Sequence, residues 1–198
     1  MCFHTLGVLA NAGYNIKVNI EGYRERKLTL AYYFGNQQYI KDTVKMGADG
    51  AYTFSGQTPL LPGIYTLVMT PTNVGIDLLV SEKEQQFSVQ TKKASPHADL
   101  KFIGSKENEL FQQYIHFVSK HNPQLDTLRA QYKRSAEGPK KEKIKQALQK
   151  VDSTVQQYLQ EFLRVNKDSY AALVIKSSLS IRYPSFSGTD EEKVLKTW

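Results

Sequence analysis

Apolar and polar residues alternate along the first half of the chain. Ile16, Val18 and Ile20 fall on one side of the segment 14–21, with Asn and Lys residues between them. A period of two is typical of a strand that has one buried face and one face in solvent. Six further short segments, rich in aromatic and β-branched residues, predict strands at 27–34, 38–44, 51–55, 64–70, 76–80 and 86–90.

Glycine-containing turn signals separate these segments. Asp49-Gly50 predicts a hairpin between the strands 38–44 and 51–55, because this pair tolerates the positive φ that tight turns need. Short strands at regular spacing indicate an antiparallel sandwich or barrel. We expect a sandwich whose strand Tyr and Phe residues lie mainly in the core, since aromatic residues favour half-buried pleated surfaces.

The period changes after Phe102-Ile103-Gly104. Ser105 is a plausible helix N-cap, and Glu107 and Glu109 follow it in the first turn. One apolar stripe then continues on either side of Asn122-Pro123, where we expect the helix to break or kink. The stripe consists of Leu110, Phe111, Tyr114, Phe117 and Val118, and then Leu125, Leu128 and Tyr132.

Gly138-Pro139 predicts a loop and a new helix start. Apolar residues then recur at alternating steps of four and three, which is a heptad pattern. We expect an antiparallel helical hairpin in preference to a coiled coil between chains. Asp168 is expected to cap a third helix over 169–176, and a fourth begins at Gly188. The heptad residues are Ile144, Leu148, Val151, Val155, Tyr158, Phe162 and Val165.

The pattern therefore predicts an α+β protein, with an N-terminal antiparallel β-sandwich over residues 13–103 followed by a C-terminal α-helical region over 104–198. The last segment stops in its second helical turn on Trp198. An isolated helix this short is marginal, so we expect the helical region to be truncated. Apolar surface near Leu195 and Trp198 would then favour self-association.

Residues 1–12 are interpreted as the remnant of an export signal. Leu6 to Ala10 is apolar, and Ala10-Asn11-Ala12 has the small-x-small pattern that signal peptidase recognises. The alternative is a disordered or edge-strand N-terminus with a chance match. Export predicts the periplasm or cell envelope and removal of Cys2. No recognisable base accompanies Cys2, so it is not predicted to be a nucleophile.

Composition excludes several protein classes. The single Cys among 198 residues excludes a disulfide scaffold, a Cys-rich zinc site and a CxxC redox motif. No apolar run is long enough for a polytopic membrane protein, and we expect no integral membrane segment in the mature chain. The net charge of +7 first suggests a nucleic-acid partner. Residues 1–100, however, hold 9 Lys and Arg against 8 Asp and Glu, so the excess lies in the second half.

The basic cluster Lys140-Lys141-Glu142-Lys143-Ile144-Lys145 could contact phosphates. Glu142 interrupts it, Ile144 belongs to the heptad pattern, and cations at a helix start gain nothing from the dipole. We interpret it as a solvated helix face and expect no nucleic-acid partner.

No arrangement of residues predicts catalysis, and we predict no catalytic, cofactor-binding or metal-binding residue, no cofactor and no enzymatic activity for this chain. Phosphate-loop and dinucleotide motifs are absent, as is HExxH. His116 and His121 lie five residues apart and so on different faces of a helix, which suits a metal pair poorly. Sequence alone does not pair Asp77 with Glu82 or Glu84.

The stretch 22–65 resembles the N-terminal β-domain of unknown function that precedes thioredoxin-like domains in exported proteins of Gram-negative gut bacteria. The residues that carry the likeness are Leu28-Thr29-Leu30, Ile40-Lys41-Asp42-Thr43, the turn and strand from Asp49 to Gly56, and Pro62-Gly63-Ile64-Tyr65. The helical half is similar to the region that follows in such proteins.

The resemblance implies a role in envelope thiol–disulfide chemistry for a complete protein, but its redox residues carry over to no position here. The first hypothesis is a non-catalytic spacer, docking or dimerisation module of an exported thioredoxin-like protein. A protein partner or self-association is expected. The second is an independent β-sandwich that binds a glycan or peptide. An enzyme with an unrecognised motif is the third.

Overall fold

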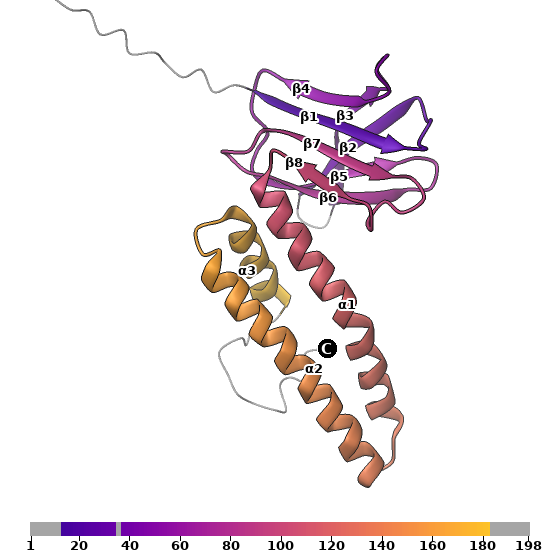
Figure 1. The fold of residues 1–198 in the computed structure, drawn as a ribbon, viewed down its shortest axis with the longest axis vertical. Helices are drawn as coiled ribbons and strands as arrows, with labels where there is room; N and C mark the ends of the chain where they lie inside the picture. Colours follow the sequence, from indigo (N-terminus) through magenta and orange to yellow (C-terminus); the bar gives the residue numbers. More distant parts are fainter. Residues whose placement is uncertain (1–12, 35–36, 183–198) are drawn as a thin grey trace, which may run out of the picture. The chain divides into compact units, whose positions relative to one another are not determined.

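The computed structural model describes residues 13–34 and 37–182, with side chains described up to residue 179. The chain divides into two compact units, and the boundary falls between Glu109 and Leu110. The first contains two β-sheets of four strands each and the start of a helix, and the second is helical (Figure 1). The α+β class with an N-terminal β-sandwich is therefore confirmed.

One sheet has the order β4-β1-β7-β8 and the other the order β3-β2-β5-β6. All seven predicted strands are present, with ends shifted by a few residues at most. Their bounds are β1 Tyr14–Glu21, β2 Lys27–Phe34, β3 Gln37–Lys45, β4 Tyr52–Gly56, β5 Gly63–Met69, β6 Val74–Val80, β7 Gln86–Lys92 and the unpredicted β8 Lys101–Ile103.

The pairing departs from the sequence prediction at two places. Strands β1 and β7 are parallel, although the remaining neighbours are antiparallel. The hairpin predicted at Asp49-Gly50 is wrong, because β3 pairs with β2 and β4 pairs with β1 in the other sheet. The turn itself is tight, with Gly50 at φ 76°. It therefore carries the chain from one sheet to the other.

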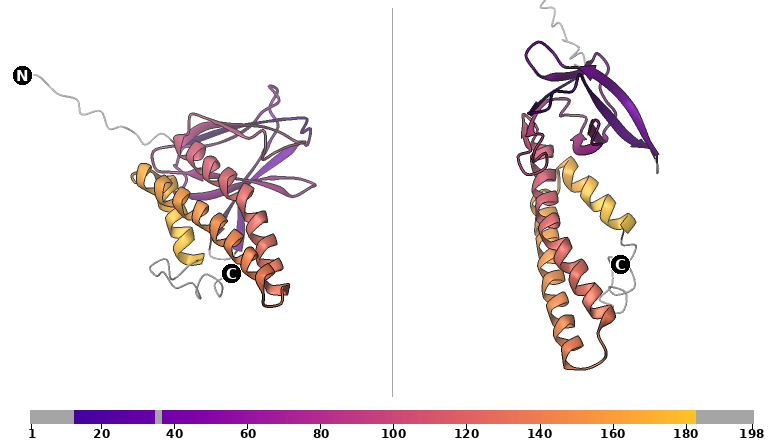
Figure 2. Two further views of the ribbon diagram at one scale, coloured as in Figure 1. Left: turned by 60° about the horizontal axis from the view of Figure 1, so that its bottom comes forward. Right: turned by 90° about the vertical axis from the view of Figure 1, so that its right-hand side faces the viewer.

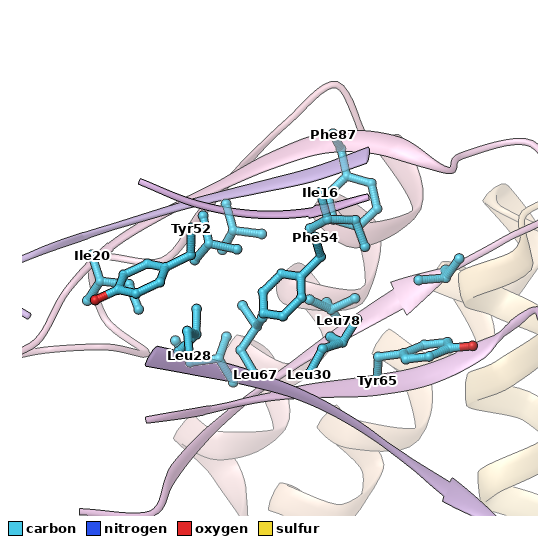
Figure 3. Close-up of a cluster of buried hydrophobic side chains, with 14 of the residues drawn as sticks. Ile16, Ile20, Leu28, Leu30, Tyr52, Phe54, Tyr65, Leu67, Leu78 and Phe87 are labelled. Carbon is cyan, nitrogen blue, oxygen red and sulfur yellow. The ribbon is translucent and has the colours of Figure 1, made fainter. Parts of the chain in front are cut away.

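The sandwich core lies between the inward faces of the two sheets (Figure 3). Alternation places Ile16, Val18 and Ile20 of β1 inside, with exposed fractions of 4% or less. The ring of Phe54 points from one sheet toward Leu67 of the other. Burial of such side chains contributes about 1.5–3 kcal/mol each to folding.

Three helices are described: α1 Lys106–Arg134, α2 Pro139–Val165 and α3 Tyr170–Arg182. Pro123 does not break α1, which continues through it. Proline has no backbone N–H, so the carbonyl of Ser119 loses its donor within the helix, and Ser119 is exposed to solvent. Pro139 is the first residue of α2, as the sequence predicts.

Helices α1 and α2 form the expected antiparallel hairpin (Figures 1 and 2). The Phe117 and Tyr158 rings stack with centroids 3.6 Å apart, and Tyr114 lies 6.4 Å from Phe162. Residue numbers that rise in α1 therefore meet numbers that fall in α2. Of the heptad residues, Leu148, Val155 and Phe162 are buried, whereas Val165 is 61% exposed.

The cap of α3 is Ser169, and the prediction of Asp168 is wrong. The Ser169 hydroxyl accepts the N–H of Ala172 at 3.0 Å, which is the N-cap bond expected of serine. The fourth helix predicted from Gly188, and the apolar residues Leu195 and Trp198, lie outside the described residues, as do Cys2 and residues 1–12.

Candidate protein-association surface

Residues that suggested chemistry in the sequence have structural contacts in the fold. Asp77 accepts a hydrogen bond from Thr66 Oγ1 at 2.7 Å. Glu82 is exposed, whereas Glu84 accepts hydrogen bonds at the start of α1. No group of three or more His, Cys, Asp or Glu with a metal-binding arrangement occurs among the described residues.

The described histidines of α1 are not brought together as ligands. The His121 ring stacks on Phe117 with centroids 4.2 Å apart, and its Nδ1 lies 2.8 Å from the Phe117 carbonyl. His116 is exposed one turn away. His97 lies in the loop between β7 and β8, in the other unit.

The basic cluster at the start of α2 has local partners. Lys141 forms an ion pair with Glu137, and its Nζ lies 4.9 Å from the centroid of the Tyr132 ring. That pairing raises the pKa of Lys141 above its ordinary value. Lys140 and Lys143 are exposed to solvent, which is consistent with a solvated helix face.

The most distinctive exposed feature is the end of the β2–β3 hairpin. Four large side chains there, which we call the hairpin patch, are exposed: Tyr33 by 57%, Phe34 by 75%, Tyr39 by 41% and Ile40 by 71%. Their side chains lie on both faces of the hairpin end, and clustered exposed apolar residues mark interaction sites more often than isolated ones do.

The strand register explains why the hairpin patch is uncovered. Strand β5 pairs with β2 only from Thr29 to Tyr32, so β3 is the only described strand that pairs with Tyr33 and Phe34. The right-hand view of Figure 2 shows the two strands running past the rest of their sheet. The hairpin end therefore extends beyond the edge of the core.

A ladder of three tyrosines connects the hairpin patch to the core. Tyr39, Tyr32 and Tyr65 occupy paired positions on β3, β2 and β5, with ring centroids 5.8 and 6.1 Å apart. The inner ring, Tyr65, is buried and donates its hydroxyl to the Leu61 carbonyl at 2.9 Å. The exposed Tyr39 stacks on Tyr32, which in turn packs on the buried Tyr65, and these contacts restrain it. A restrained aromatic side chain loses less entropy on binding.

Strand β3 also provides a free sheet edge. It is the outermost strand of its sheet, and on its other side no described strand pairs with it. Such an edge presents backbone N–H and C=O groups that can accept another strand. The arrangement suits association with an extended polypeptide, and none of its parts was identified from the sequence.

The sequence contained a partial signal for this surface. Tyr32-Tyr33-Phe34 is followed by Gln37-Gln38-Tyr39, so aromatic residues flank a short turn. Strand aromatics were predicted to lie mainly in the core, and Tyr52, Phe54 and Tyr65 do so. Tyr33 and Phe34 do not, because the end of β5 pairing is not encoded within the β2 segment.

Among the described residues, no helix combines the length and hydropathy needed to cross a bilayer.

Searches of curated proteins and of solved structures return no match. One protein-family model matches the chain, over the β-sandwich and the first residues of α1. Residues 14–111 match the family described as a domain of unknown function, DUF4369.

Proposed function

We propose that this chain is a non-catalytic module that associates with another polypeptide through the hairpin patch and the free edge of β3. The observation that carries the proposal is the exposure of Tyr33, Phe34 and Ile40 on a hairpin end that no third strand covers among the residues the structure describes. An exposed edge supplies backbone hydrogen bonds, and flanking side chains supply selectivity.

A selection on a displayed random-peptide library tests this function with the full chain. We expect apolar peptides to be enriched on the wild type and lost on a chain carrying Phe34→Ser and Ile40→Thr. Both side chains are exposed, so the double variant should keep its fold. Ile103→Thr, at a 52% exposed position on β8, is the matched control. Equal enrichment on all three chains contradicts the proposal.

The alternative function is binding of a glycan, which the restrained and exposed ring of Tyr39 favours. Sugars stack on such rings through their apolar faces. A glycan array run in parallel separates the two functions. A glycan signal that depends on Tyr39, with no peptide enrichment, would favour the alternative.

We further propose that the module belongs to an exported protein of the periplasm or cell envelope that carries a thioredoxin-like domain. The resemblance at Leu28-Thr29-Leu30 and Pro62-Gly63-Ile64-Tyr65 supports this, together with the match to a domain of unknown function. Sequencing the flanking coding region tests it. A CxxC-bearing domain in frame supports the context, and a stop codon directly after Trp198 contradicts it.

The module itself is proposed to have no thiol–disulfide activity. It contains a single cysteine, and CxxC chemistry needs two. Reduction of insulin by the purified chain should equal the buffer blank. Turnover above that blank would contradict a non-catalytic role.

A further inference from the structure

The free edge of β3 can pair with the same edge of a second copy of this chain. This inference rests on the association function proposed above. We propose that two copies of this chain pair β3 to β3, antiparallel, about a two-fold axis between Lys41 and Asp42. The two four-stranded sheets would then join into one continuous sheet across the pair.

A register shift in β3 makes this pairing geometrically possible. Opposite β2, Leu30 pairs with Asp42 and the next residue, Ala31, pairs with Ile40, so Lys41 is the extra residue of a bulge. Thr43 pairs with Thr29, which shares a face with Ala31 because strand residues two apart do. Ile40 and Thr43 therefore lie on the outer face together.

The core-facing positions show the same symmetry about the bulge. Tyr39 pairs with Tyr32, and Val44 pairs with Leu28. Leu28 is buried in the core, and the partly buried Tyr32 and Val44 pack against that core. Tyr39 and Val44 consequently share the core face, although their numbers differ by five.

Two identical strands related by a two-fold axis normal to the sheet must pair residues that lie on the same face. A regular strand meets this condition only when a residue opposes itself or one an even number away. The bulge changes the condition, so that Ile40 can oppose Thr43 of the second copy. In the same register Tyr39 opposes Val44 of the second copy, and apolar side chains meet.

Charge selects this register over its neighbours. It places Lys41 opposite Asp42 of the second copy, and the two-fold axis repeats the contact. A shift by one residue would place Lys41 opposite Lys41, or Asp42 opposite Asp42, and directly opposed like charges are unfavourable. Neither residue has an ion-pair partner within the part of the chain that the structure describes.

The competing interpretation is a protected edge, because lysines and bulges keep many edge strands free of partners. Two observations favour pairing. Lys41 is followed by Asp42, which makes the edge self-complementary in charge, although Asp42 Oδ1 accepts the N–H of Thr43 at 2.7 Å and pairing would replace that bond. The hairpin patch also places exposed Ile40 on this same strand.

Charge reversal tests the register directly with the full chain. In Lys41→Asp the pairing opposes Asp to Asp twice, and in Asp42→Lys it opposes Lys to Lys twice. We expect each variant alone to self-associate about tenfold more weakly than the wild type, by sedimentation equilibrium. When the two variants are mixed in equal amounts, both contacts of a mixed pair bring an Asp of one chain opposite a Lys of the other. A heterodimer as strong as the wild-type dimer should form.

The matched control is Lys101→Asp, at an exposed position on the edge strand β8 of the other sheet. It should associate as the wild type does. Recovery in the mixture cannot come from a folding defect, because each component would carry that defect into the mixture. Native mass spectrometry of the mixture, with one variant isotope-labelled, distinguishes the heterodimer from either homodimer.

Two results would overturn the inference. A wild-type chain that stays monomeric at millimolar concentration excludes the second copy as partner. A wild type that self-associates while the mixture is no stronger than its components excludes this register. Neither result decides the proposed function. That function is tested separately, by the loss of peptide enrichment in the double variant Phe34→Ser and Ile40→Thr.

Discussion

At the residue scale, Asn108 shows how one buried side chain can take the place of a strand. Its Oδ1 accepts the N–H of Leu79, and its Nδ2 donates to the Leu79 carbonyl, both at 2.7 Å. Leu79 lies in β6, the edge strand opposite β3 in the same sheet. The amide thus satisfies backbone groups that an edge would leave open, which is why Asn108 is fully buried in a polar role.

Replacing Asn108 with Leu should destabilise the sandwich by about 2–4 kcal/mol, because two buried backbone groups of Leu79 lose their partners. Urea unfolding followed by circular dichroism measures the loss. Gln113→Leu, an exposed amide on the same helix, is the control and should shift stability by less than about 0.5 kcal/mol. Similar losses in the two variants would show that Leu79 is satisfied in another way.

Glu84 is the second residue whose role becomes clear only in the fold. Its carboxylate accepts the Ser105 hydroxyl at 2.5 Å and the N–H groups of Lys106 at 3.0 Å and Glu107 at 3.1 Å. Ser105 in turn accepts the N–H of Asn108 at 3.2 Å, so its predicted N-cap role is confirmed. A carboxylate here satisfies free helix donors and favours the positive end of the helix dipole.

We expect Glu84→Ala to cost about 1–2 kcal/mol of unfolding free energy, since it removes charge-assisted bonds at a helix start. Thermal unfolding of the full chain gives the value. The neighbouring exposed Glu82→Ala serves as control and should leave the midpoint nearly unchanged. If the two variants unfold at the same temperature, water replaces the carboxylate at no cost.

At the element scale, periodicity predicts which segments become strands and helices, but pairing depends on residues far away. Ile16, Val18 and Ile20 alternate because one face of β1 meets a core, and that pattern is visible in the sequence. The same pattern suits parallel and antiparallel neighbours equally, so the parallel β7 partner was not predicted. The three residues of β8 are too few to show a period.

Helix ends show a similar division. Ser105 and Pro139 mark their helices by local chemistry that the sequence contains. Asp168 and Ser169 are both good N-caps, and the choice of Ser169 depends on where α3 packs. Burial of Ala171 and Ile175 on one side of α3 is part of that packing.

Helix α2 holds one partly buried acid that makes its stability depend on pH. Desolvation raises the pKa of Asp152, while the charge of Arg129 opposes the rise. The folded state therefore holds this proton more strongly than the unfolded state does. Its contribution to stability is greatest below the unfolded pKa of about 3.9 and decreases as pH rises toward the raised folded value.

Asp152→Asn should remove this penalty, so the variant is expected to gain stability relative to the wild type at pH 7 and to lose that advantage near pH 3. Thermal unfolding at several pH values follows the difference. The control is Asp126→Asn, which removes the exposed carboxylate that forms an ion pair with Arg129 on helix α1. A difference that does not vary with pH would contradict the assignment to desolvation.

At the scale of the whole molecule, the two units have different characters. In the part of the chain that the structure describes, the sandwich combines an apolar core with an exposed hairpin end, whereas the sequence of the helical unit carries most of the net positive charge. The charge excess thus suggests less about function than the exposed side chains do. Aromatic content alone does not reveal the hairpin patch, because β2 contributes Tyr32 to the core margin and Phe34 to solvent.

The most direct test of association through this edge is amide hydrogen exchange in β3, followed residue by residue by NMR as concentration is raised. We predict that β3 amides without a bond to β2 exchange more slowly at high concentration, while those at the edges β4 and β8 keep their rates. Exchange in β3 that is independent of concentration, or slowing confined to another edge, would contradict the account.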